Sequence, residues 1–108
     1  MKQHEGSELV RLDLNNPVFQ GNLLNLEKPD RHSAMETLRK IRQLTWNQVY
    51  TDPGLKWDKI ASVSPPPGVA SLYSLRITQS RRATAFREGD FMRFLTIAPD
   101  HDAAYGRK

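Results

Sequence analysis

The pattern of apolar and polar positions divides the chain into a largely helical first half and a β-rich second half. Residues 8–14 (ELVRLDL) alternate apolar and polar side chains, and this two-residue period predicts a short strand. Asn16 and Pro17 predict the start of a helix, because proline fits the first helical position, where its missing N–H costs nothing. We expect residues 28–30 (KPD) to break that helix.

A longer helix is predicted over residues 30–44. Apolar side chains recur at near-helical spacing from Met35 to Leu44, and basic side chains occupy the other side. Ser33 and Glu36 have the spacing of a capping box, which would fit a helix that starts a few residues later.

A further helical turn is predicted over residues 45–50. Thr45 and Gln48 again have the spacing of a capping box. Residues 52–54 (DPG) have the composition of a turn and end the helical half of the chain.

The second half of the chain predicts strands. Residues 56–63 read as a strand, although their first five (KWDKI) also fit a helical turn. Residues 65–68 (PPPG) are predicted to form a loop, because proline cannot donate to a strand ladder. Three further strands are predicted over residues 72–78, 82–87 and 91–97. Residues 88–90 (EGD) have a tight-turn composition and join the last two strands as a hairpin.

This order of elements predicts an α+β fold, a small antiparallel β-sheet with two or three N-terminal helices packed on one face. Residues 1–7 are expected to be a disordered tail, and residues 8–108 a single domain. No uninterrupted apolar stretch occurs in the first thirty residues, so we expect neither a signal peptide nor a membrane span. The absence of cysteine excludes disulfide and thiolate chemistry and fits a cytoplasmic location.

Positive charge gathers in the second half of the chain. Residues 1–55 carry seven Lys/Arg and seven Asp/Glu, whereas residues 56–108 carry nine and five, which accounts for the whole net charge of +4. Arg81, Arg82 and Arg87 fall within seven residues. Such a one-sided basic patch is typical of a nucleic-acid-binding surface, and an ordinary solvated face is the alternative.

Several kinds of chemistry find no support in the sequence. The three histidines are scattered and lack the close spacing of a metal site, and no glycine-rich phosphate loop or serine nucleophile elbow is present. We therefore expect no metal and no cofactor.

The residues that remain are suited to metal-free cleavage of RNA. Attack of a 2′-hydroxyl on its own phosphodiester needs a proton acceptor, a cation for the crowded phosphorane and an acid for the leaving oxygen. Histidine can transfer protons near neutral pH, which suits His101 to both proton transfers. The planar guanidinium of Arg82 can bind two phosphate oxygens at once. Tyr105 can stack on a nucleobase or pass a proton. Each of these residues also has a purely structural explanation, as part of a strand, a turn or the tail. The functional explanation gains support because adjacent antiparallel strands would bring Arg76, Arg82 and the segment after the last strand together on one face.

Residues 73–105 (YSLRITQSRRATAFREGDFMRFLTIAPDHDAAY) resemble the C-terminal half of toxins of the RelE/ParE superfamily, and are most similar to YoeB-like members. The GLKW segment (residues 54–57) and the order of the N-terminal elements are also similar in layout. The resemblance implies a ribosome-dependent endoribonuclease that cuts mRNA and is neutralised by a cognate antitoxin. It implies contact with DNA only indirectly, through a toxin–antitoxin complex.

The resemblance also implies roles for individual residues. Arg82 matches the arginine that stabilises the transition state, Arg76 and Lys56 match basic substrate-binding residues, and His101 and Tyr105 match the catalytic groups at the C-terminus. The neighbouring Arg81 and Arg87 are further candidates for substrate binding.

The chain departs from the YoeB-like pattern at two places. Three residues separate His101 from Tyr105, where YoeB-like members place histidine and tyrosine side by side. Those members carry a glutamate base ahead of the third strand, where this chain offers Asp58, so we favour His101 as the base. Two alternatives stay open: a non-enzymatic toxin of the ParE branch that inhibits DNA gyrase, or an inactive relative that binds nucleic acid.

Overall fold

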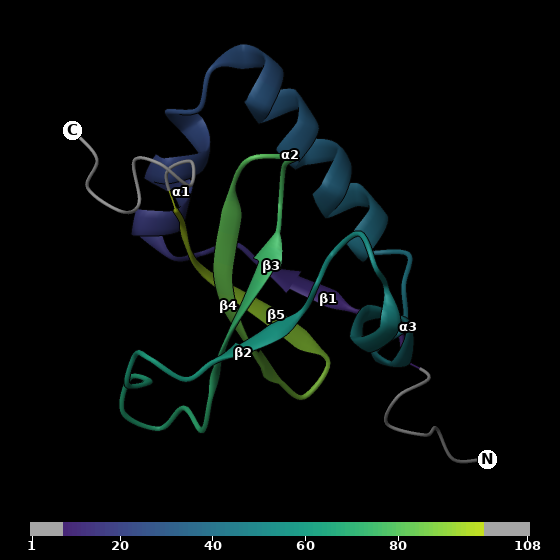
Figure 1. Cartoon of the computed structure of the whole chain (residues 1–108), viewed down its shortest axis with the longest axis vertical. Helices are drawn as coiled ribbons and strands as arrows, with labels where there is room; N and C mark the ends of the chain where they lie inside the picture. The colour runs from purple at the N-terminus through teal and green to yellow at the C-terminus, as the bar shows by residue number, and fades with distance from the viewer. Residues whose placement is uncertain (1–7, 99–108) are drawn as a thin grey trace.

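The strands form one mixed sheet, and three helices precede its second strand along the chain (Figure 1). The structure is a computed structural model and describes residues 8–98. The elements are β1 (Arg11–Asp13), α1 (Pro17–Leu24), α2 (Lys28–Ile41), α3 (Trp46–Thr51), β2 (Asp58–Ile60), β3 (Leu72–Arg76), β4 (Arg82–Glu88) and β5 (Phe91–Ile97). Over these residues the fold is α+β, as predicted; the predicted tail at residues 1–7 lies outside the described part.

The sheet is mixed rather than antiparallel, because its first strand runs parallel to its last. The strand order is β1-β5-β4-β3-β2, and the three pairs among β2 to β5 are antiparallel. β1 pairs with β5 in parallel, with Arg11 opposite Phe91 and Asp13 opposite Arg93. All three helices and three strands separate β1 from β5 along the chain, so no tight turn forces these two strands to be antiparallel. The prediction of a purely antiparallel sheet was wrong for this pair.

Two of the predicted helix starts are confirmed. The side-chain oxygen of Asn16 accepts the backbone N–H groups of Val18 and Phe19 at 2.7 and 3.3 Å, and Pro17 is the first residue of α1. At α3 the Thr45 hydroxyl accepts the N–H of Gln48 at 3.2 Å, and the Gln48 side chain accepts the N–H of Thr45 at 2.9 Å. The capping box therefore forms as predicted.

The longest helix begins and ends earlier than predicted. Pro29 lies in the first turn of α2, where backbone N–H groups have no partner within the helix, so it starts this helix instead of interrupting one. Ser33 lies inside the helix, and the capping box predicted for it does not form. α2 ends at Ile41, and the carbonyl of Leu44 accepts the N–H of Val10 at 2.9 Å. The end of the helix is thus held against the chain that leads into β1.

One face of the sheet carries the core. Phe94 and Ile97 are three residues apart, a spacing that places side chains on opposite faces of a regular strand. In β5, however, Phe94 pairs with Ala85 and Thr96 pairs with Thr84, so a β-bulge at Leu95 returns Ile97 to the face of Phe94. The buried residues that the helices add to this core are Phe19, Ala34, Leu38, Ile41, Trp46 and Val49. The helices therefore cover this face of the sheet.

Three predicted strands are longer than the observed ones. The strand predicted over residues 8–14 shortens to β1 (Arg11–Asp13), and the one over residues 72–78 ends at Arg76. The expected strand over residues 56–63 shortens to Asp58–Ile60, because the proline-rich segment that follows cannot continue the ladder. β5 has the predicted bounds, and the turn that joins it to β4 contains Gly89 with a φ of 63°. Among residues 8–98, no helix is long and apolar enough to cross a membrane.

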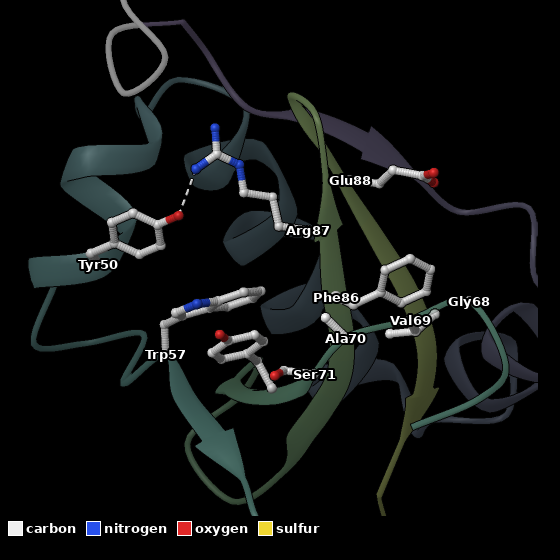
Figure 2. A pocket seen from close by; sticks show the side chains of 10 residues that line it. Tyr50, Trp57, Gly68, Val69, Ala70, Ser71, Phe86, Arg87 and Glu88 are labelled. Atoms are coloured by element: carbon white, nitrogen blue, oxygen red, sulfur yellow. Dashed lines mark hydrogen bonds between the residues drawn. The ribbon is translucent and has the colours of Figure 1, made fainter. Parts of the chain in front are cut away.

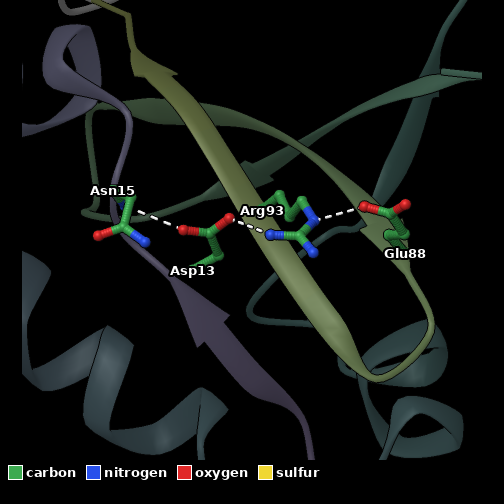
Figure 3. Close-up of polar contacts among 4 residues, drawn as sticks. All are labelled: Asp13, Asn15, Glu88 and Arg93. Atoms are coloured by element: carbon green, nitrogen blue, oxygen red, sulfur yellow. Dashed lines mark hydrogen bonds and ion pairs between the residues drawn. The ribbon is translucent and has the colours of Figure 1, made fainter. Parts of the chain in front are cut away.

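An ionic network fixes β1 to β5 on the face away from the helices (Figure 3). Asp13 forms an ion pair with Arg93, whose Nε also donates to Glu88 at 2.6 Å. The carboxylate of Asp13 accepts the backbone N–H of Asn15 at 3.0 Å. This N–H, together with the Arg93 guanidinium, lowers the pKa of Asp13 below its usual value of 3.8, against the opposing effect of burial.

We expect Asp13→Asn to weaken the pH dependence of the free energy of unfolding. Because the folded-state pKa of Asp13 is lowered, its ionised carboxylate stabilises the fold above the unfolded-state pKa, and this contribution is lost as the pH falls through the folded-state value. Urea unfolding at about pH 6 and about pH 2.5 measures the difference.

The matched control is Glu88→Gln, which removes the more exposed carboxylate from the same arginine. We expect it to keep the wild-type pH profile, because exposed ion pairs contribute little to stability. An Asp13→Asn protein that loses as much stability in acid as the wild type would contradict the prediction.

Candidate functional site

Two arginines lie directly opposite each other at one end of the β3–β4 pair. The register aligns Arg76 with Arg82, on the face of the sheet opposite the core. Residues paired in this way have Cβ atoms only about 4.5–5.5 Å apart, and like charges at that distance are destabilising. Two arginines paired on one face of a sheet form a candidate site for an anion with several acceptor oxygens.

Neutral oxygen atoms fix one of the two guanidinium groups. Arg82 donates to the Ser74 hydroxyl from Nε at 3.3 Å and from Nη2 at 2.9 Å. Its Nη2 also donates to the backbone carbonyl of Lys56 at 3.0 Å. Among the residues that the structure describes, these acceptors orient Arg82 and no carboxylate forms an ion pair with it, which suits its positive charge to a ligand.

The backbone is left-handed at Lys56, whose carbonyl accepts the hydrogen bond from Arg82. Lys56 has a φ of 49°, which non-glycine residues rarely adopt and which is typical of functional or strained positions. Asp52 stabilises the preceding turn. Its carboxylate accepts a hydrogen bond from the N–H of Leu55 at 2.9 Å and forms an ion pair with Lys40 at 3.0 Å. Burial by itself would raise the pKa of Asp52. The hydrogen bonds from Lys40 and Leu55 have the larger combined effect in the opposite direction, so the pKa lies below its usual value.

A row of polar side chains runs across the sheet beside the arginine pair. The strand register places Asp58 opposite Ser74, Ser74 opposite Thr84, and Thr84 opposite Thr96. The Thr84 and Thr96 hydroxyls lie 2.8 Å apart. The exposed carboxylate of Asp58 is therefore separated from Arg82 only by Ser74, on the same face of the sheet.

The end of β5 also lies beside Arg82. The N–H of Ala98 donates to the carbonyl of Arg82 at 2.7 Å, and Ala98 is the last residue that the structure describes. His101 and Tyr105, the predicted catalytic residues, lie outside the described residues. His101 follows Ala98 by three residues in the sequence.

Five basic residues were predicted to bind the substrate or to stabilise the transition state, and the structure brings three of them together. Lys56, Arg76 and Arg82 meet at the site, where the side chain of Lys56 is exposed. Arg81 forms an ion pair with Asp30 at 3.1 Å and so ties the β3–β4 turn to α2. Arg87 lies near the opposite end of β4, where it donates to the Tyr50 hydroxyl at 2.6 Å.

Sequence reasoning missed an aromatic pocket of about 330 Å³ where β3 begins (Figure 2). Its aromatic residues are Tyr50, Trp57, Tyr73 and Phe86, and Arg87 and Glu88 add charge to its wall. Tyr73 shares the helix-side face with the buried Leu75 two residues later, so alternation along β3 was a signal for the face on which Tyr73 lies. The rest of the pocket depends on long-range contacts.

Comparisons with protein-family models, with curated proteins and with solved structures find no match to this chain. The resemblance to the RelE/ParE superfamily therefore stays a prediction. Within residues 8–98, no group of three or more His, Cys, Asp or Glu side chains lies close enough to hold a metal ion.

We expect Arg76→Gln to raise the free energy of unfolding by up to about 1 kcal/mol in low salt, because it removes a like charge directly opposite Arg82. The gain should shrink as salt screens the repulsion. Urea unfolding at low and high ionic strength measures both effects.

Arg81→Gln is the matched control, since it removes an arginine five residues away that has a carboxylate partner. We expect it to lower stability by up to about 1 kcal/mol. If Arg76→Gln instead destabilises the protein in low salt, Arg76 and Arg82 do not repel each other and the site is not poised for an anion.

Proposed function

We propose that the chain is the toxin of a type II toxin–antitoxin pair and acts as a metal-free endoribonuclease on mRNA, on the ribosome. The observation that carries the proposal is the placement of Arg76 opposite Arg82, together with the neutral oxygen atoms that hold Arg82 within residues 8–98. A phosphodiester offers the oxygen atoms that such a pair binds well. The resemblance to YoeB-like toxins supports the choice of RNA as the substrate.

In the proposed reaction, a 2′-hydroxyl oxygen attacks the adjacent phosphorus and the bond to the 5′-oxygen breaks. The products are a 2′,3′-cyclic phosphate and a free 5′-hydroxyl. Arg82 stabilises the extra negative charge of the pentacoordinate phosphorus, while Arg76 and the side chain of Lys56 bind the flanking phosphate oxygens. The fixed orientation of Arg82 favours this role, because a preorganised cation needs no rearrangement during the reaction.

The reaction also needs groups that accept and donate protons. We assign both transfers to His101, assisted by Tyr105, because the chain leaves β5 beside Arg82 and His101 follows three residues later. Asp58 is the rival proton acceptor, since its carboxylate shares the face and the polar row of the arginine pair.

A cognate antitoxin is the proposed protein partner of this chain. An antitoxin that covers the Arg76–Arg82 face would block access to RNA, and an acidic segment would suit that face by its charge. We propose that the toxin acts in the cytoplasm, where translating ribosomes present mRNA.

Arg82→Ala is expected to lower RNA cleavage by about 100- to 1,000-fold, the usual cost of removing one preorganised group that stabilises transition-state charge. The measurement is a transcriptome-wide map of new RNA 5′ ends shortly after induction in bacteria. Arg39→Ala is the control, because this exposed α2 arginine lies away from the arginine pair and forms an ion pair with Glu36 in the adjacent turn. New ends should cluster within coding regions for the wild type and the control, and disappear for Arg82→Ala.

Other outcomes would favour the alternatives. A folded Arg82→Ala protein that still cleaves mRNA would contradict the ribonuclease proposal. DNA breaks without new RNA ends would indicate gyrase inhibition, as in the ParE branch. RNA binding that weakens steeply with salt, without cleavage, would indicate an inactive nucleic-acid-binding relative.

A second pair of variants tests the proton acceptor. We expect His101→Ala to slow cleavage by about 100- to 10,000-fold, the usual contribution of general acid–base catalysis, and Asp58→Asn to slow it by less than about tenfold. Single-turnover cleavage of ribosome-bound mRNA measures both rates. If Asp58→Asn slows cleavage more than His101→Ala does, Asp58 is the proton acceptor.

A further inference from the structure

The Ser74 hydroxyl belongs to the same patch of surface as the arginine pair. Ser74 precedes Arg76 by two residues on β3, or about 7 Å of strand, so both side chains project from the face opposite the core. Arg82 lies directly opposite Arg76 and donates to the Ser74 oxygen. Ser74 is partly exposed, as are both arginines. A ligand between the two arginines would therefore also meet Ser74.

The two hydrogen bonds from Arg82 use the accepting side of the Ser74 oxygen. A serine hydroxyl has two lone pairs that accept hydrogen bonds and one proton that it can donate. The Nε and Nη2 groups of Arg82 both donate to this oxygen, at 3.3 and 2.9 Å. The proton of Ser74 therefore points away from Arg82 and is left for another acceptor.

No acceptor for this proton lies among residues 8–98. The neighbouring hydroxyls of Thr84 and Thr96 lie 2.8 Å apart and bond to each other. Asp58 is opposite Ser74 on β2, but its side chain is exposed and no hydrogen bond joins the two. Within the described part of the chain, Ser74 thus keeps an unused donor beside two cations.

We propose that the Ser74 hydroxyl is a third donor of the anion site, and that it donates its proton in a hydrogen bond to a non-bridging oxygen of the phosphate held by Arg76 and Arg82. The inference rests on the proposed function for the identity of the anion, an RNA phosphodiester. A phosphate group offers only acceptors, so a hydroxyl can bind it only through its proton.

Arg82 makes Ser74 a better donor. Hydrogen bonds that end on a hydroxyl oxygen polarise its O–H bond, and such chains strengthen one another. The bond from Ser74 also strengthens as negative charge grows on the phosphate oxygens during attack by the 2′-hydroxyl. Arg82 therefore acts twice on the substrate, through its own charge and through Ser74.

Binding of a non-cleavable RNA to the full-length protein tests the donor. The probe is a short single-stranded 2′-O-methyl RNA, which lacks the attacking hydroxyl. We expect Ser74→Ala to weaken binding by about 10- to 100-fold, the loss for one hydrogen bond to a charged group. The slope of log affinity against log salt should not change, because no charge is removed, whereas Arg82→Ala should reduce it by about 0.7.

Two further serine variants are the controls. Ser80→Ala makes the same change at an exposed position between β3 and β4, and we expect it to alter binding by less than about twofold, as is usual for a surface substitution. Ser74→Thr keeps the hydroxyl and suits a strand, so it should bind the probe nearly as well as the wild type. Unfolding curves establish that the variants are folded.

The double variant separates donation to the phosphate from orientation of Arg82. If Ser74 acted only by holding Arg82, its removal would have no effect once Arg82 is gone. We expect Ser74→Ala to weaken probe binding by about 3- to 10-fold further in the Arg82→Ala protein, the value of one hydrogen bond without polarisation. No further loss would overturn the proposal and leave Ser74 as a positioning residue.

The remaining outcomes distinguish this proposal from the proposed function. A folded Ser74→Ala protein that binds the probe like the wild type, with cleavage that still depends on Arg82, would overturn the donor and leave the ribonuclease intact. Probe binding that depends on Ser74, in a protein that cleaves no RNA, would support the donor and contradict the ribonuclease. A protein that binds neither the RNA probe nor inorganic phosphate would overturn both.

Discussion

The alternation of side chains along β3, β4 and β5 is the constraint on which the rest of the molecule depends. One face must bury the apolar sides of the helices, and the small side chains of Ala83 and Ala85 in the central strand leave room there for large rings such as Phe19 and Trp46. The bulge at Leu95 keeps Ile97 on that face. Polar residues of the same strands are thereby collected on the opposite face, so the arginine pair is a consequence of how the core is built.

Local signals predicted the elements better than their arrangement. The caps at Asn16 and Thr45 depend on neighbouring residues alone, and both form as predicted. Pro29 was misread because proline disfavours a helix interior but suits a first turn, and the choice depends on where the chain needs the helix to begin. The parallel pairing of β1 with β5 was not predictable, since no turn residue connects them and their contact is decided by packing across the whole chain.

The candidate site was predictable where a short connection fixed the register. A tight turn between β3 and β4 makes Arg76 and Arg82 neighbours, and the alternation of the strands puts them on one face. The destinations of Arg81 and Arg87 were not predictable, because Asp30 and Tyr50 reach them from helices far away in the sequence. The aromatic pocket escaped notice for the same reason: it combines rings from a helix, a loop and two strands. The predicted His101 and Tyr105 lie beyond the described residues.

The two outermost strands, β1 and β2, are each three residues long, and each carries charged side chains. A sheet can grow by strand addition only at its edges, and short, charged edges offer an incoming chain few hydrogen bonds and unfavourable desolvation. Neighbouring copies therefore gain little from joining sheet to sheet. High concentrations of this chain should favour separate molecules over cross-β fibres, even though the longest and most apolar strands lie only one or two positions from an edge.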